Sequence, residues 1–111
     1  TGLTGAGLAG ALRPSLGELG PSLTALRLGE NAITSVPTEL GALTGLTYLD
    51  LETNAIISSV PTELGALTGL TFLDLATNEL TSLPTGIGNL VVLGYLGLRE
   101  NALTSLPSEI G

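Results

Sequence analysis

The side chains in this chain best suited to chemistry are three carboxylates. Asp50 and Asp74 occupy the same place in two similar segments, and Glu52 follows shortly after Asp50. Carboxylate oxygens bind hard cations such as Ca²⁺, which takes about six to eight oxygen ligands. Because no loop in the sequence offers a dense acidic run, we expect these carboxylates to be solvated and partly neutralised by Arg27, with no metal and no cofactor bound.

Catalytic groups of other kinds are missing from the sequence. It contains no histidine and no cysteine, and its 3 basic residues are all arginines. The serines that recur along the chain therefore have no base to activate them, and no glycine-rich phosphate loop is present. Paired carboxylates act as acid and base when a cleft separates their pKa values, which an open sheet does not provide. We expect no enzymatic activity.

The elements that must hold these carboxylates come from a sequence repeat. Four asparagines recur at spacings of 23, 24 and 23 residues, and each precedes a proline: Asn31, Asn54, Asn78 and Asn101. Each asparagine stands in the same frame of leucines, which in the first copy reads Leu23-x-x-Leu26-x-Leu28-x-x-Asn31-x-Ile33. A fixed period of about 20–29 residues in this frame is typical of a solenoid.

The frame resembles the leucine-rich repeat family, and so does the second half of each copy, which begins Val36-Pro37-Thr38-Glu39-Leu40 in the first. The Leu-x-Gly-x-Leu pattern around Gly10 is similar to plant-type repeats, whereas residues 80–84 and 103–107 resemble a shorter, often intracellular Leu-Pro type. The resemblance covers nearly the whole chain. It implies an α/β solenoid, a right-handed superhelix with a concave parallel β-sheet and short helical or 3₁₀ turns on the convex side.

We expect the chain to form a single domain of stacked repeats. Residues 1–22 are a degenerate N-terminal repeat in which Ala6 replaces the asparagine, and residues 23–111 are four leucine-rich repeats, 23–45, 46–69, 70–92 and 93–111. Repeat arrays are stabilised by contact between neighbours and usually need polar caps at their ends. Neither end shows such a cap, so we expect a segment of a longer protein, a processed product, or a subunit whose ends are covered by partners.

The recurring asparagines are expected to be structural. A buried asparagine side chain offers two donors and an acceptor to backbone groups of its own turn and of the neighbouring repeat. Leaving such a group without a partner costs about 1–3 kcal/mol, so a ladder of asparagines should stabilise the stack. One extra residue in the second repeat, near Ile57, should lengthen the convex side locally.

The only three aromatic residues share one repeat position within segments that alternate polar and apolar residues, as half-buried strands do. Adjacent strands should therefore place the three rings side by side on the concave face. Aromatic anchors flanked by charged and polar groups are the usual make-up of a protein-binding surface, although stacked rings also stabilise each other without a partner. We expect a protein partner to contact eight residues: Tyr48, Phe72, Tyr95, Arg27, Asp50, Asp74, Glu52 and Arg99.

Two other interpretations stay open. A chain with only 12% charged residues fits a structural subunit buried in a larger complex. Alternatively, hydroxyl side chains form two columns that an ice or glycan surface could engage: Thr34, Ser58, Thr81 and Thr104, with Ser35, Ser59, Ser82 and Ser105. A net charge of −7 disfavours nucleic acid as a partner, and no apolar run of about 18 residues predicts membrane insertion. The compartment is not indicated.

Overall fold

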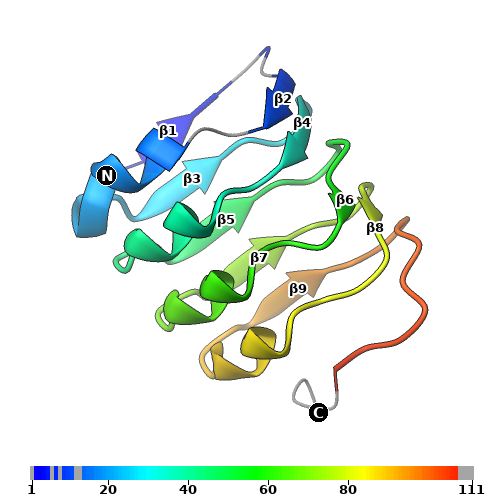
Figure 1. Ribbon diagram of the computed structural model, residues 1–111. Helices are drawn as coiled ribbons and strands as arrows, with labels where there is room; N and C mark the ends of the chain where they lie inside the picture. Colours follow the sequence, from blue (N-terminus) through cyan, green and yellow to red (C-terminus); the bar gives the residue numbers. More distant parts are fainter. Residues whose placement is uncertain (1, 6, 8, 12–13, 108–111) are drawn as a thin grey trace.

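The computed structural model describes residues 2–5, 7, 9–11 and 14–107, which form a solenoid built on one parallel sheet (Figure 1). The sheet has five strands in the order β1-β3-β5-β7-β9. Their bounds are β1 (Gly2–Thr4), β3 (Ala25–Arg27), β5 (Tyr48–Asp50), β7 (Phe72–Asp74) and β9 (Tyr95–Gly97). Equivalent residues pair across the sheet, so that Ala25, Tyr48, Phe72 and Tyr95 stand side by side. Each repeat thus adds one strand, as its sequence period predicts.

The return path of each repeat contains a 3₁₀ turn, and these turns form a second row in front of the sheet in Figure 1. They are η1 (Pro14–Ser22), η2 (Thr38–Ala42), η3 (Thr62–Ala66) and η4 (Thr85–Asn89). A proline in extended conformation directly precedes each of η2, η3 and η4, where no amide donor is required. None of the helical segments in the described part of the chain has the length and apolar character of a membrane-spanning helix.

Aliphatic side chains from the strands and turns form one core that runs along the stack. The central strand residues Leu26, Leu49 and Leu73 are fully buried between the sheet and the turns. In the last described repeat, the core positions are only partly buried: Leu93, Leu96, Leu98 and Leu103. Because each repeat supplies only one layer of this core, its leucines depend on the layers beside them for burial.

Two short strand pairs lie within the segments that connect a strand of the five-stranded sheet to the following 3₁₀ turn. β2 (Ala9–Ala11) pairs with β4 (Ala32–Ser35), and β6 (Ile57–Ser58) pairs with β8 (Glu79–Leu80). Within the part of the chain that the structure describes, no pairing joins β4 to β6. The break lies beside the extra residue predicted near Ile57, whose side chain is 58% exposed. Strand pairing is therefore interrupted between the repeat that holds Thr34 and Ser35 and the repeat that holds Ser58 and Ser59, so it does not run continuously along either column of hydroxyl residues.

Shortly after each of β3, β5, β7 and β9 the chain passes through a residue other than glycine in the left-handed conformation, which the sequence did not indicate. The φ angles of Glu30, Thr53, Thr77 and Glu100 are 57°, 58°, 56° and 56°. Such angles are uncommon for residues other than glycine and are strained for threonine. Backbone bonds between repeats hold the turn in place, because the Thr53 amide donates to the Ala76 carbonyl at 2.9 Å and the Asn54 amide donates to the Thr77 carbonyl at 3.2 Å.

The N-terminal unit follows the plan of the regular repeats. Its strand β1 pairs with β3 in step, and the carbonyl of Gly5 accepts a bond from the Asn31 side chain at 3.1 Å. The register pairs Gly2 with Ala25 and Ala9 with Ala32, an offset of 23 residues. Ala6 is 25 residues from Asn31, so the prediction that it stands at the asparagine position is wrong. Ala6 itself lies outside the described residues, as do residues 108–111 at the end of the fourth repeat. The parallel sheet and the 3₁₀ turns confirm the solenoid fold predicted from the sequence.

Candidate functional site

The three aromatic side chains form a stacked row on one face of the five-stranded sheet. This face points away from the buried leucines and the 3₁₀ turns, corresponds to the face predicted to be concave, and is called the outer face below. Tyr48 pairs with Phe72, and Phe72 pairs with Tyr95, in the strand register. Their ring centroids lie 4.3 Å and 4.7 Å apart, with planes 3° and 7° from parallel. Tyr95 is 49% exposed, and the other two rings are half-buried. We call these three residues the ring row; their placement on one face agrees with the prediction.

Between Arg27 and Tyr95, the ring row presents edges rather than faces to solvent. Within the row each ring covers a face of the next, and the guanidinium carbon of Arg27 lies 4.8 Å from the centroid of the Tyr48 ring, a distance typical of a cation–π contact. The edge of an aromatic ring carries partial positive charge, whereas its face carries partial negative charge. A partner approaching the sheet therefore meets aromatic edges with partial positive charge and the phenolic hydroxyls of Tyr48 and Tyr95.

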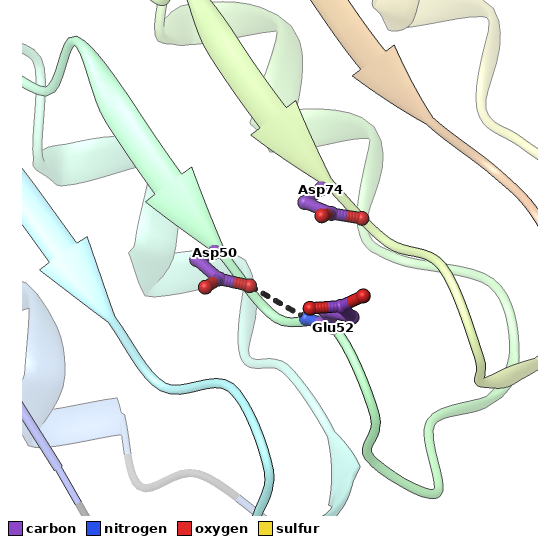
Figure 2. Close-up of side chains that lie close together, drawn as sticks. All are labelled: Asp50, Glu52 and Asp74. Atoms are coloured by element: carbon purple, nitrogen blue, oxygen red, sulfur yellow. Dashed lines mark hydrogen bonds between the residues drawn. The ribbon is translucent and has the colours of Figure 1, made fainter.

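Three carboxylates lie beside the ring row, at the ends of β5 and β7. Asp50, Glu52 and Asp74 each have an oxygen within 4.8 Å of the others (Figure 2). An oxygen of Asp50 accepts the Glu52 amide at 2.9 Å, and an oxygen of Asp74 accepts the Ala76 amide at 3.0 Å. The expectation of solvated carboxylates is wrong for Asp74, which is only 7% exposed. The strand register and these two backbone bonds account for the cluster, so it does not by itself specify a cation site.

Glu52 lies close to several other negative charges. The Asp74 carboxylate, partial burial and the Asp50 carboxylate together raise the pKa of Glu52 above its ordinary value, and the nearby Arg99 guanidinium offsets only part of this effect. Arg27 and Arg99, the two basic residues predicted for this site, are exposed. The carboxylates thus leave an excess of negative charge on this part of the sheet face.

Replacing Glu52 by glutamine should stabilise the protein at neutral pH. Because the pKa of Glu52 is raised in the folded state, the folded protein binds the Glu52 proton more tightly than the unfolded protein does. The wild-type protein therefore gains stability as pH falls from the raised pKa toward the ordinary glutamate value. Glu52→Gln removes this dependence. Melting temperatures measured against pH should therefore show the variant above wild type at pH 7, with the difference shrinking in acid.

A matched variant tests whether the effect comes from the cluster. Glu63 lies in η3, away from the sheet face, and Glu63→Gln removes the same charge from the protein. A rise in melting temperature as large in Glu63→Gln as in Glu52→Gln would show that net charge, rather than repulsion within the cluster, explains the stabilisation.

A recess next to the cluster was not predicted. It has a volume of about 220 Å³ and is lined by Thr4, Gly5, Arg27, Gly29, Glu30, Asp50 and Glu52. Gly29 stands where the next repeat has Glu52, and its missing side chain leaves space close to the Asp50 carboxylate, only 3.2 Å from where a β-carbon would lie. Gly29 shares its repeat position with the larger residues Glu52, Ala76 and Arg99. This difference in size is the sequence feature that could have predicted the recess.

The asparagines predicted to be structural form a hydrogen-bonded ladder behind the site. The amide nitrogen of Asn54 donates to the carbonyls of Leu51 and Leu28, both at 3.0 Å, and its oxygen accepts the Ile33 amide at 3.0 Å. Asn31, Asn78 and Asn101 likewise donate to a carbonyl of their own repeat and to one of the preceding repeat. The ladder fixes the strand ends from which the carboxylates project.

Comparisons with known proteins agree on one family. The leucine-rich repeat family profile matches residues 21–80. Among solved structures, a leucine-rich repeat protein of Leptospira interrogans is 38% identical, with a TM-score of 0.84 over 94% of this chain and 26% of that chain. The plant peptide hormone receptor RGFR1 in complex with RGF2 is 32% identical, with a TM-score of 0.87 over 99% of this chain and 18% of that chain.

The BIR3–SERK2 complex of Arabidopsis thaliana gives a similar result, with 34% identity and a TM-score of 0.82 over 92% of this chain and 56% of the matched chain. This chain therefore spans about a quarter or less of the first two relatives and just over half of the third. No curated protein matches its sequence.

Proposed function

Because this chain belongs to the leucine-rich repeat family, we propose that it is a non-catalytic module that binds a protein or peptide partner on the outer face of its five-stranded sheet. The ring row is the observation that carries this proposal. Its three aromatic side chains are contiguous, half-buried or exposed, and flanked by charged groups. Surfaces with this composition supply much of the binding energy in protein complexes.

The relatives support a binding role. RGFR1 is a peptide hormone receptor with a structure in complex with RGF2, and BIR3 has a structure in complex with SERK2. Domains of this family are generally binding modules without catalytic activity. Extending this role to the present chain is a proposal, because the chain spans only part of each relative.

The residues proposed to contact the partner are the ring row together with Arg27, Asp50, Glu52, Asp74 and Arg99. The repeat limits 1–22, 23–45, 46–69, 70–92 and 93–111 remain our proposed division of the chain, supported by one sheet strand in each unit. Asp74 is the exception within the proposed contact set. Because it is buried and bonded to the Ala76 amide, we assign it to holding the surface in shape and to its charge.

Selection of binding peptides tests the proposal and requires no identified partner. Short random peptides displayed on phage would be selected on the folded protein, and the bound sequences would then be tested against a variant with Tyr48→Ala, Phe72→Ala and Tyr95→Ala. We expect binding to fall by about tenfold or more in this variant, because hot-spot truncations typically cost at least about 2 kcal/mol. Circular dichroism would confirm that the variant remains folded.

The control removes a similar number of exposed apolar side chains elsewhere. Ile57→Ala, Val91→Ala and Leu106→Ala truncate aliphatic residues that are 58%, 82% and 53% exposed, and none of them belongs to the ring row. Binding that survives in the ring-row variant and is lost in this control would contradict the proposal. Such a result would favour the alternative of a structural subunit held by its other surfaces.

A further inference from the structure

We propose, as an extension that rests on the proposed function, that the partner presents an extended segment with an arginine two residues from an apolar side chain. The apolar side chain would contact the ring row. The arginine would pair with the carboxylates of Asp50 and Glu52 at the end of β5. The proposal thus assigns both a charge and a spacing to the segment that occupies the sheet face.

Charge complementarity selects a basic segment. The ends of β3 and β5 and the residues that follow them carry Glu30, Asp50 and Glu52 around one recess, with Arg27 as the only basic residue in its lining. The Arg27 guanidinium lies over the Tyr48 ring. The raised pKa of Glu52, which Arg99 offsets only in part, agrees with an excess of negative charge here. An incoming guanidinium would relieve that repulsion.

Most ring faces of the ring row are already covered and are therefore not available to a cation. Cation–π attraction requires access to a ring face, and the faces within the row are covered by neighbouring rings at 4.3 Å and 4.7 Å. Arg27 lies over the Tyr48 ring. The ring edges carry partial positive charge and surround large apolar ring surfaces, with a hydroxyl only at Tyr48 and Tyr95, so they favour an aliphatic or aromatic side chain over a cation. The apolar side chain of the partner should therefore contact the ring row, and its arginine should contact the neighbouring column of residues that contains Asp50.

The spacing of the two columns matches an extended chain. Tyr48 and Asp50 are two residues apart on β5 and point to the same face of the sheet, which separates them by about 6.6 Å along the strand. Alternate side chains of an extended partner lying parallel to the strands have the same separation. The recess of about 220 Å³ beside Asp50 and Glu52 provides room for the arginine, whose planar fork can pair with carboxylates through two bonds.

The test uses the phage-selected peptides that bind the ring row. We expect their sequences to be enriched in arginine two positions from an apolar residue. One such peptide, fluorescently labelled, would be titrated by anisotropy with wild type and with an Asp50→Asn, Glu52→Gln double variant. The affinity should fall by about tenfold or more in the variant, as expected for the loss of a charge-assisted contact, and it should fall with added salt in wild type.

Two controls isolate the contact. Glu39→Gln combined with Glu63→Gln removes the same charge from the turns η2 and η3 and should leave the affinity within about twofold, a difference of only about 0.4 kcal/mol. Replacing the peptide arginine by alanine should weaken binding to wild type but have little further effect in the Asp50→Asn, Glu52→Gln variant, because the two changes remove the same pair.

Failure of this inference differs from failure of the proposed function. Selected peptides that need the ring row but carry no excess of basic residues would overturn the inference and leave the proposed function standing. An equal loss of affinity in the two charge-removal variants would also overturn the inference, because it would show only a general effect of net charge. If no selected peptide depends on the ring row, both proposals are wrong.

Discussion

Replacing Asn78 by alanine should lower the free energy of unfolding by about 3–5 kcal/mol, since two or more buried backbone groups would lose partners worth about 1–3 kcal/mol each. The Asn78 amide nitrogen donates to the carbonyls of Leu51, Leu75 and Ala76 at 2.9, 3.2 and 3.2 Å. Its oxygen accepts the Ile56 amide at 3.1 Å. The side chain is only 7% exposed, so water cannot readily replace these bonds.

Chemical denaturation measures this cost, and two further variants test its cause. Asn101 makes the same contacts but is only half-buried, so Asn101→Ala should cost less than Asn78→Ala. Asn78→Asp keeps an acceptor for the Ile56 amide but loses both donors and faces three carbonyl oxygens with a carboxylate. It should be at least as destabilising as alanine. Equal costs for Asn78→Ala and Asn101→Ala would rule out burial as the reason for the effect.

Alanine at Gly45 should be strongly destabilising, whereas alanine at Gly69 should be tolerated, although both glycines occupy the same repeat position. A β-carbon at Gly45 would overlap the carbonyl oxygen of Pro21, a backbone atom. At Gly69 the nearest atom to a new β-carbon is the Leu46 carbonyl oxygen, 3.9 Å away. We expect Gly45→Ala to cost about 3 kcal/mol, near the upper end for overpacking, and Gly69→Ala to be neutral or to stabilise by up to about 1 kcal/mol.

The difference between the two glycines comes from the preceding unit. The 3₁₀ segment η1 is interrupted at Gly20, which has φ 63° and ψ −163°, and Pro21 follows directly. This kink brings the Pro21 carbonyl against Gly45. Paired denaturation curves for the two alanine variants provide the measurement. Similar stabilities for both would show that the η1 segment moves aside readily and does not pack firmly against the second unit.

Features that repeat along the chain could be predicted from the sequence. The positions of Leu49 and Leu73 in the frame give the strands and their buried face, and the equivalence of Tyr48, Phe72 and Tyr95 gives the ring row. Both follow because a parallel sheet with one strand per repeat turns sequence period directly into spatial register. The backbone bonds of Asn54 follow from the same logic, since a polar group buried in a repeated turn needs the same partners in each copy.

Features that depend on side-chain direction could not be read from the period. Asp50 and Asp74 are equivalent in sequence, yet Asp74 is buried while Asp50 is half-exposed. The difference arises because Gly97, in the next strand, leaves room for the Asp74 carboxylate; a β-carbon there would lie 2.5 Å from one of its oxygens. The left-handed conformation of Thr53 was also missed, because threonine gives no local signal for a positive φ angle.

Each asparagine of the ladder makes hydrogen bonds to backbone groups of the repeat that precedes it in the chain. Asn54 accepts the Ile33 amide and donates to the Leu28 carbonyl, and Asn78 does the same for Ile56 and Leu51. A repeat therefore keeps unmatched polar groups until its C-terminal neighbour has docked. A ribosome delivers the repeats in this same order, N-terminal first. Each newly synthesised repeat thus completes the hydrogen bonds of its predecessor, and the nascent chain can fold progressively behind the point of synthesis.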